Sequence, residues 1–493
     1  MRHSKSVFVP FSVGFVVMLV VAGYSLTSTS LDFDEGATLS AATRSTGELF
    51  DLAGYKDAVL APFYLLLIGV VKIFGESDAA LRLPSLLAMA AGAGVTAELG
   101  RRVAGQAAGI VAGIICSTLP SLVLFAHTAR PYAFAFLFAT LSSLLLLTAV
   151  RNPAWWRWAL YGLCVALTGV FHLVALSVLA AHVVILAIAW WKERDNRLLW
   201  SIPAVGAALV VVAPLVWMGR DQRYSQLHWV ETPTWKTIVT LPGDITFSPP
   251  VGYLLVGLAV AAYAALPARR YAELFALVAV PIVVVIGVSL VAPVWVPRYG
   301  IFLLAPLAVL AAATITAEHV QAVAVPRLAR IVAIVVALAF LSLPMQQSVR
   351  QTNNSPDTRG MASAIHANAA AGDVIVYTDY AWSMRPTLTH YLGQLEWNRT
   401  AQPPDRLMKQ TAAANGTLEA TEFNDIQGRL TKVPRIWLIG PAAGSFGAPN
   451  DPLTAPGWKI KYISQQYKIQ QTYTFRTGRA VLLVARTDTP APA

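Results

Sequence analysis

Apolar segments long enough to cross a membrane recur along most of the chain. A spanning helix needs about 20 predominantly apolar residues. The chain is 56% hydrophobic and 13% charged, whereas soluble domains carry about 25% charged residues. Residues 1–346 are therefore predicted to form an α-helical polytopic membrane domain with about eleven spans. The runs lie near 7–26, 83–100, 107–126, 131–150, 158–171, 173–191, 198–218, 251–266, 271–292, 300–317 and 329–346.

Basic residues between these runs predict the orientation, because cytoplasmic loops carry an excess of Lys and Arg. The deciding segment is Val59–Phe74, which is apolar but short and contains Lys72. If it does not cross, the N-terminal Arg2 and Lys5 share one side with every dense basic cluster. We therefore predict a helix in the outer interface or a re-entrant one, in a multi-pass plasma-membrane protein with a cytoplasmic N-terminus. The clusters are Arg101/Arg102, Arg151/Arg157, Lys192/Arg194/Arg197, Arg269/Arg270 and Arg327/Arg330.

The tail after residue 346 has a different character. It is polar, begins with a linker at Asn353–Gly360, and contains short β-rich runs at Asp373–Thr378, Arg435–Gly440 and Ala480–Arg486. Alternating short apolar runs with helical segments between them indicate an α/β domain. Residues 347–493 are predicted to form this domain on the extracytoplasmic side.

The net charge of +11 does not predict nucleic-acid binding here. Insertion orientation and contact with anionic membrane lipid explain basic residues in short loops between apolar runs. Cys116 and Cys164 lie inside apolar stretches, and no Cys/His spacing typical of a metal site is present. No metal site and no cofactor are predicted, and a divalent cation stays open as an alternative.

Carboxylates gather in the first predicted outer loop. Asp32, Asp34 and Glu35 follow the first span, and Asp57 precedes the interfacial segment beside Lys56. A charged stop after the span, or acids at a helix N-terminus, would explain the first group structurally. Acidic residues contribute little to orientation, however, so catalysis is the alternative for Asp34. Asp57 is equally compatible with a solvated loop residue.

Two arginines lie at the outer starts of spans, against the trend of the other basic residues. Arg130 precedes Pro131 in "HTARPYAF", and Arg298 stands beside Tyr299 in "VWVPRYG". A charge at membrane depth costs at least a few kcal/mol unless it is partnered. Either arginine could reach water by extending its side chain along the helix, which is called snorkelling. The functional alternative is that each arginine binds an anionic head group or a phosphate. His172 also lies near the outer level and alone does not indicate a metal site.

The order of several motifs resembles the GT-C glycosyltransferases of the polyprenyl-phosphate-mannose type, a group that includes protein O-mannosyltransferases and aminoarabinose transferases. The resemblance covers about residues 7–346. It is carried by "DEGATLSAA", "DAVLAPFYLLLIGVVKIFG", "ALRLPS", "LGRRVAGQAAGIVAG", "ARPYAF", "FHLVAL" and "PRYGIFLLAPLAVLAA", in that order. The ordered set is typical of the superfamily and says little about the substrate.

The resemblance implies roles residue by residue. The first acidic motif matches Asp34 and Glu35, with Asp34 as general base. The second matches Asp57, Pro62 and Tyr64, but Leu60 and Ala61 replace the family's His and first Pro. Substrate-binding positions of the family fall on Arg130 and Tyr132, on His172, and on Arg298 and Tyr299. The Gln-Glu pair that precedes the family's arginine is His127-Thr128 here.

The resemblance therefore implies an inverting transfer of a sugar, mannose or a pentose, from a polyprenyl-phosphate donor to a glycan, lipid or protein acceptor of the cell envelope. Arg130 and Arg298 would stabilise the phosphate leaving group, and one carboxylate would suffice as base. A transporter or flippase of a lipid-linked or glycan substrate is the alternative, although neither internal repeats nor mid-helix charges support it. A scaffold that has lost catalysis is the third hypothesis, because of Leu60 and Ala61.

Overall fold

The chain divides into two compact units in the structure, a computed structural model that describes residues 8–318, 326–351, 355–379, 381 and 383–486. The helical unit comprises Met1–Leu26, Asp57–Phe63 and Arg82–Gln351. The mixed unit comprises Thr27–Lys56, Tyr64–Leu81 and Thr352–Ala493. The predicted division at residue 346 therefore differs in one respect: most of the first outer loop groups with the C-terminal region. The predicted cytoplasmic residues Arg2 and Lys5 lie outside the described residues.

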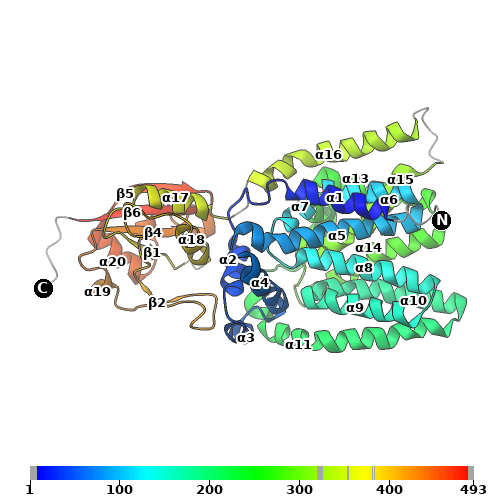
Figure 1. Cartoon of the computed structure of the whole chain (residues 1–493), viewed down its shortest axis with the longest axis horizontal. Helices are drawn as coiled ribbons and strands as arrows, with labels where there is room; N and C mark the ends of the chain where they lie inside the picture. Colours follow the sequence, from blue (N-terminus) through cyan, green and yellow to red (C-terminus); the bar gives the residue numbers. More distant parts are fainter. Residues whose placement is uncertain (1–7, 319–325, 352–354, 380, 382, 487–493) are drawn as a thin grey trace. The chain divides into compact units, whose positions relative to one another are not determined.

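Every predicted spanning run is helical, and the predicted polytopic helical fold is confirmed. Seven helices of the described chain are long and apolar enough to cross a membrane, or nine if each of two bent pairs counts as one span. Figure 1 shows them side by side along the helical unit. The α-helices of the helical unit, including those too short to count as spans, are α1 (Val9–Gly23), α5 (Asp78–Ala104), α6 (Gln106–Thr118), α7 (Pro120–Ala126), α8 (Tyr132–Arg151), α9 (Trp155–Phe171), α10 (Val178–Glu193), α11 (Ser201–Leu227), α12 (Trp235–Thr246), α13 (Pro249–Ala265), α14 (Ala268–Ser289), α15 (Leu304–Thr316) and α16 (Arg327–Gln351).

Two segments differ from the expectation of straight spans and loops. The run near 107–126 is broken between α6 and α7 by a bend of 70°. The cause is Pro120, which lacks an N–H and holds Leu119 in an extended conformation with ψ 118°. The stretch expected as a loop before residue 250 contains α12, which meets α13 at 101°.

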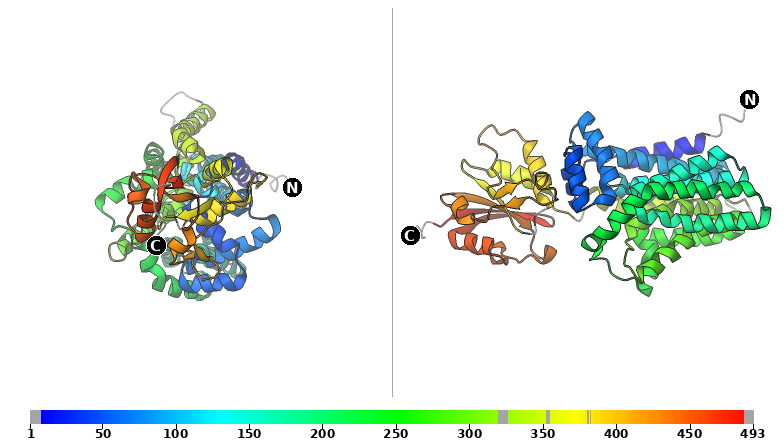
Figure 2. Two further views of the ribbon diagram at one scale, coloured as in Figure 1. Left: turned by 90° about the vertical axis from the view of Figure 1, so that its left-hand side faces the viewer. Right: turned by 90° about the horizontal axis from the view of Figure 1, so that it is seen from below.

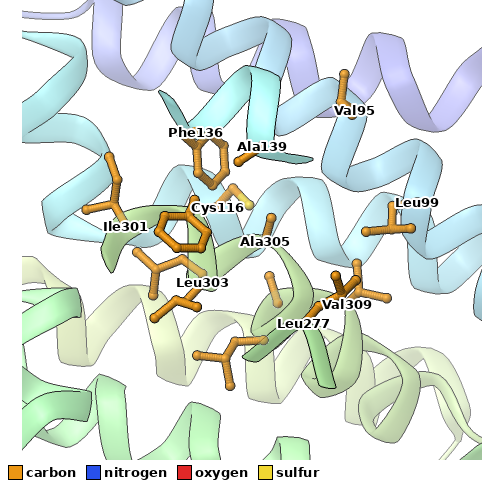
Figure 3. Packing of buried hydrophobic residues seen from close by; sticks show 14 of the residues in the cluster. Val95, Leu99, Cys116, Phe136, Ala139, Leu277, Ile301, Leu303, Ala305 and Val309 are labelled. Atoms are coloured by element: carbon orange, nitrogen blue, oxygen red, sulfur yellow. The ribbon is translucent and has the colours of Figure 1, made fainter. Parts of the chain in front are cut away.

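Small residues let the helices of this unit approach closely. A Cβ built on Gly113 of α6 would lie 2.8 Å from the Cα of Gly14 in α1, so the two backbones are in near contact. Close approach through small residues is typical of helix packing in membranes, where dispersion replaces the hydrophobic effect. Figure 3 shows how Leu99, Phe136 and Val309 fill the remaining space at the centre of this unit.

Basic side chains close the C-terminal end of α1. Arg82 is buried, and its Nη1 donates to the carbonyl oxygen of Leu26 at 2.9 Å. Nη2 of Arg350 donates to the carbonyl of Val21 at 2.8 Å, and the ring of His127 contacts a further carbonyl of the helix. Cations near the last carbonyls of a helix are stabilising. These contacts give basic residues near this helix end a structural role.

The mixed unit contains α2 (Phe33–Ala42), α3 (Thr46–Tyr55) and most of α4 (Ala61–Phe74), together with the C-terminal α/β region. Its four-stranded sheet has the order β1-β4-β6-β5, with β1 and β4 parallel and the other neighbours antiparallel. Figure 2 shows helices on both faces of this sheet. The strands are β1 (Val374–Tyr377), β4 (Arg435–Pro441), β5 (Tyr467–Phe475) and β6 (Gly478–Ala485), with a separate pair β2 (Met408–Gln410) and β3 (Thr421–Glu422).

The predicted strands β1, β4 and β6 are confirmed, whereas β5 is missing from the prediction. Its side chains are mostly exposed, so "YKIQQTYTF" carries little of the apolar signal that marks a buried strand. Part of the expected linker is also helical, since α17 (Thr358–Asn368) begins at Thr358 with Asp357 as its N-cap. Residues 353 and 354 of that linker lie outside the described residues.

Helix α2 packs against α18 (Met384–Gly393) within the mixed unit, and Gly36 makes this possible. A Cβ at Gly36 would lie 2.9 Å from the carbonyl oxygen of Ser383 and 3.0 Å from the methyl of Thr387. The backbone of α2 is therefore held directly against the start of α18. This places the helix that carries Asp34 in the same compact body as the sheet.

The bend between α12 and α13 predicts that alanine substitutions at two glycines of α13 differ sharply in their effect on stability. A Cβ on Gly252 would lie 2.0 Å from the carbonyl oxygen of Pro242, whereas a Cβ on Gly257 meets nothing within 4 Å. Gly252→Ala should cost about 1–3 kcal/mol or more through overpacking, and Gly257→Ala should not. Thermal unfolding midpoints in detergent, followed by size-exclusion fluorescence, measure this. Equal midpoints for the two variants would contradict the tight bend.

Candidate functional site

Arg298 lies among three aromatic rings of the helical unit. It begins η4 (Pro297–Leu303), a tight helical turn set by Pro297 at its first position. The guanidinium carbon lies 5.9 Å from the ring centroid of Tyr132, 5.6 Å from that of Trp229 and 5.7 Å from that of Tyr299. Aromatic faces attract a cation at this range. The rings fix where the charge lies.

His172 adjoins the same rings at the break between α9 and η2 (Leu173–Ser177). Its ring centroid is 4.7 Å from that of Tyr299 and 5.7 Å from that of Tyr132. Burial is the main cause that lowers the pKa of His172 to about 4, and the positive charges of Arg298 and Arg130 contribute to this shift. The imidazole is therefore neutral near pH 7. Its Nδ1 is buried and has no hydrogen-bond partner in the described chain.

Arg130 belongs to this cluster through its charge on His172. It lies in the short break between α7 and α8, where its backbone N–H donates to the carbonyl of Thr128 at 2.8 Å. The hydroxyl of Ser85 donates to the carbonyl of Arg130 at 3.1 Å. The break is thus fixed by hydrogen bonds to α5, and Pro131 caps the helix that follows. The structure brings together the predicted residues Arg130, Tyr132, His172, Arg298 and Tyr299.

Asp57 is held by the end of α11. It adopts a left-handed conformation with φ +61° at the start of η1 (Ala58–Leu60), a conformation that aspartate tolerates better than most residues. Nε2 of Gln226 donates to its Oδ1 at 3.1 Å, and Oε1 of Gln222 accepts from the N–H of Ala58 at 2.9 Å. Asp57 is buried, with 9% of its surface exposed. The interpretation as a solvated loop residue is therefore wrong.

The end of α11 links Asp57 to the arginine. Gln226 bonds Asp57 through its side chain, and its carbonyl accepts from the indole N–H of Trp229 at 2.8 Å. The same indole ring faces Arg298. Sequence reasoning missed both glutamines, although their spacing of four residues on a helix places them on one face.

Three acids of the first outer loop, Asp32, Asp34 and Glu35, belong to the mixed unit, whereas Asp57 belongs to the helical unit. Asp32 caps α2: its Oδ1 accepts from the N–H of Glu35 at 2.7 Å, and Oε2 of Glu35 accepts from the N–H of Asp32 at 3.1 Å. This reciprocal pair is a capping box, and it buries Glu35. Asp34 takes no part in the box and is half-buried on the first turn. The capping box thus gives Asp32 and Glu35 a structural role.

The second motif is helical where it departs from the family pattern. Leu60 ends η1 and Ala61 begins α4, so neither replacement interrupts the backbone. Tyr64, three residues further along α4, is fully buried. Burial lowers the pKa of Arg44, and Tyr64 lies near enough to this arginine to oppose that shift. Within the described ranges, no three His, Cys, Asp or Glu side chains converge as metal ligands would.

The cluster of Arg130, Tyr132, His172, Trp229, Arg298 and Tyr299, which we name the arginine cluster, has the chemistry of an anion site. It combines two permanent cations with a neutral imidazole and with three rings around the guanidinium of Arg298. Arginine in such surroundings recognises phosphate better than a lysine would. The neighbouring buried carboxylate of Asp57 favours ligands that also carry hydroxyl donors.

Known proteins resemble the chain in part of its sequence and in its fold. Residues 59–217 match the family described as dolichyl-phosphate-mannose-protein mannosyltransferase. No curated protein matches the sequence. Among solved structures, ArnT from Cupriavidus metallidurans in the apo state is 14% identical, with a TM-score of 0.58, and the match covers 95% of this chain and 97% of ArnT. ArnT bound to undecaprenyl phosphate gives 13% identity, a TM-score of 0.58, and coverage of 97% and 98%. At this identity the likeness concerns the fold, and it confirms what the motifs predicted: the chain is a multi-pass membrane protein with the fold of the GT-C glycosyltransferases.

Proposed function

We propose that the chain is an inverting glycosyltransferase that moves a sugar from a polyprenyl-phosphate donor to a cell-envelope acceptor. The observation that carries the proposal is the arginine cluster, with two cations beside a neutral histidine at helix ends. The likeness to ArnT, which was solved with undecaprenyl phosphate bound, supports a lipid-linked donor. The printed name of the matching family supports mannose as the sugar.

The proposed reaction is a single displacement. The acceptor oxygen attacks the anomeric carbon, the bond from that carbon to the phosphate oxygen breaks, and polyprenyl phosphate departs with the electron pair. Arg130 and Arg298 stabilise the negative charge that grows on the phosphate. Asp34 takes the proton of the acceptor hydroxyl as general base. One displacement inverts the anomeric configuration, whereas a retaining route would need a nucleophilic carboxylate.

The remaining predicted residues receive positioning roles in this proposal. Asp57, held by Gln226, accepts hydrogen bonds from hydroxyls of the sugar or acceptor. Tyr132 and Tyr299 order the guanidinium of Arg298, and the unsatisfied Nδ1 of His172 offers a further hydrogen bond. Glu35 and Tyr64 act through the helices α2 and α4 that they stabilise. The acceptor is a glycan, lipid or protein of the envelope, met on the outer face, with the N-terminus in the cytoplasm.

Replacing the proposed base tests the chemistry. Asp34→Asn keeps the shape of the side chain and removes its ability to take a proton, so the transfer rate should fall by roughly 10²–10⁴-fold. Asp51→Asn, an exposed acid on neighbouring α3, is the matched control and should leave the rate unchanged. The measurement is release of polyprenyl phosphate from a radiolabelled donor by purified protein. Full activity of Asp34→Asn would remove Asp34 from the reaction.

The arginine cluster predicts that charge alone is insufficient at residue 298. Arg298→Lys keeps the charge but loses the planar donors that the three rings order, so kcat/KM for the donor should fall at least about tenfold. Arg194 is a suitable control, because its guanidinium also lies over two rings, 4.8 Å from Trp190 and 4.7 Å from Trp191. Arg194→Lys should change kcat/KM by less than about twofold. Equal effects of the two variants would contradict phosphate binding by Arg298.

A substitution at Asp57 distinguishes a positioning role of this residue from a role as covalent nucleophile. Asp57→Asn can still accept the hydrogen bond from Gln226, so it should retain more than about a tenth of the wild-type kcat, with the loss mainly in KM. A nucleophile would lose nearly all activity. Asp221→Asn, an exposed acid on α11, is the control. Inactivity of Asp57→Asn together with a glycosylated Asp57 in the trapped wild-type enzyme would establish a retaining route instead.

A further inference from the structure

The mixed unit encloses a cavity of about 550 Å³ that the proposed function does not use. All of its lining residues belong to this unit. It lies where the C-terminal half of α2 faces α18 and the loop between β2 and β3, and it continues the close packing that Gly36 makes with Ser383. Its volume is in the range of small-molecule sites, about 300–1,000 Å³.

The walls are largely apolar and built from small or aliphatic side chains. Leu39 of α2, Leu392 of α18, and Ala413 and Leu418 of the β2–β3 loop line the cavity, and prolines of the 402–405 segment complete it. Hydroxyls gather at its margin, from Ser40 and Thr43 on α2 and from Thr389 and Thr411 opposite. Such a lining suits a hydrocarbon body with a polar, hydroxyl-bearing end.

The charges at the cavity are engaged among themselves. Nε of Arg385 pairs with Oδ2 of Asp405 at 2.8 Å, and its Nη2 pairs with Oε1 of Glu422 at 2.5 Å. Oε2 of the same glutamate pairs with Lys459 at 2.6 Å. With two carboxylates on one guanidinium, and with the exposed acid Glu76 at the margin, the site does not favour an anionic ligand.

A carbohydrate also fits poorly. Sugars are commonly held against exposed aromatic faces, and the aromatic side chain of this lining, Tyr377, is only 2% exposed. The guanidinium of Arg385 covers its ring at 4.5 Å from the centroid. An apolar chain needs no such platform, because burying its surface is favourable in itself.

The margin of the cavity adjoins the helix predicted to lie in the membrane interface. Glu76 follows two residues after the end of α4, and α4 exposes Leu65, Ile73 and Phe74, with 48%, 74% and 62% of their surfaces accessible. These residues belong to the same unit as the cavity. Exposed apolar side chains on an interfacial helix contact acyl chains, so an amphiphile from the membrane can enter from this side.

We propose that this cavity binds the hydrocarbon chain of an uncharged, hydroxyl-bearing amphiphile drawn from the membrane. Its occupant would contact Leu39, Ser40 and Thr43, which lie on the side of α2 that faces α18, away from Asp34 by the 100° spacing of helical residues. The ligand would therefore contact the side of α2 that lies opposite Asp34, and it would leave the surroundings of Asp34 unoccupied. The β2–β3 loop also contacts the segment that follows α2, since Nη2 of Arg44 contacts the carbonyl of Thr417.

Photolabelling of the purified full-length chain tests the proposal. The probe is a monoacylglycerol with a diazirine on its chain, added to protein in nanodiscs, and labelled peptides are mapped by mass spectrometry. Labelling should concentrate in residues 402–420, should saturate, and should be competed at least about tenfold by unlabelled monoacylglycerol. The fatty acid of the same chain should label at least about tenfold less, because its carboxylate meets Glu76 and the engaged Arg385.

Neighbouring alanines supply matched variants. Ala413→Trp fills the cavity and should reduce labelling at least about fivefold, whereas Ala414→Trp, at an exposed position outside the lining, should not. Ala420→Phe, at the residue before β3, also fills the cavity and replaces Ala413→Trp if the latter lowers the thermal unfolding midpoint. In the wild-type chain the probe should also slow hydrogen exchange at residues 39–43.

Several results would overturn the proposal. They are unsaturable labelling, equal labelling of Ala413→Trp and Ala414→Trp, equal labelling by the fatty acid, or competition by a neutral disaccharide instead of the monoacylglycerol. All readouts report binding, so their failure leaves the transferase proposal intact, and an inactive enzyme can still bind the amphiphile.

Discussion

The helical unit depends on how it accommodates positive charge at the ends of apolar helices. A guanidinium at that depth costs several kcal/mol unless the protein surrounds it with compensating groups. Arg298 is compensated by the faces of Tyr132, Trp229 and Tyr299. The rings attract the cation and hold its charge in place. The nearby imidazole of His172 is neutral near pH 7, because burial and the charges of Arg298 and Arg130 lower its pKa to about 4.

The same constraint distinguishes two kinds of basic residue that look alike in sequence. Arg82 and Arg350 donate to carbonyls at the C-terminal end of α1, where the helix supplies the negative partner. They are structural cations. Arg298 lies against three aromatic rings, two of them from the predicted site residues Tyr132 and Tyr299, and this setting makes it a candidate ligand-binding residue. Position near a helix end therefore says less about function than the kind of group that the guanidinium meets.

Much of this organisation follows from the sequence. Long apolar runs predict helices because no other backbone arrangement satisfies its hydrogen bonds in lipid, and the strands β1, β4 and β6 are apolar enough to be recognised. Exposed β5 and amphipathic α12 carry weaker signals and were missed. Gln222 and Gln226 were missed for another reason: their task is to hold Asp57, which is far away in sequence, and only the folded chain brings them to it. Likewise, nothing in "LDFDEG" says which acid closes the capping box until the backbone of α2 is in place.

The central claim is that the arginine cluster holds the phosphate of a polyprenyl carrier. The most direct measurement compares binding of a polyprenyl phosphate with binding of the corresponding polyprenol, which has the same chain and lacks the phosphate, to the purified protein in nanodiscs. The account predicts that the phosphate binds at least about tenfold more tightly, and that this preference weakens as salt screens the charges. Equal affinity for the two lipids would show that the chain alone is recognised, and would contradict the account.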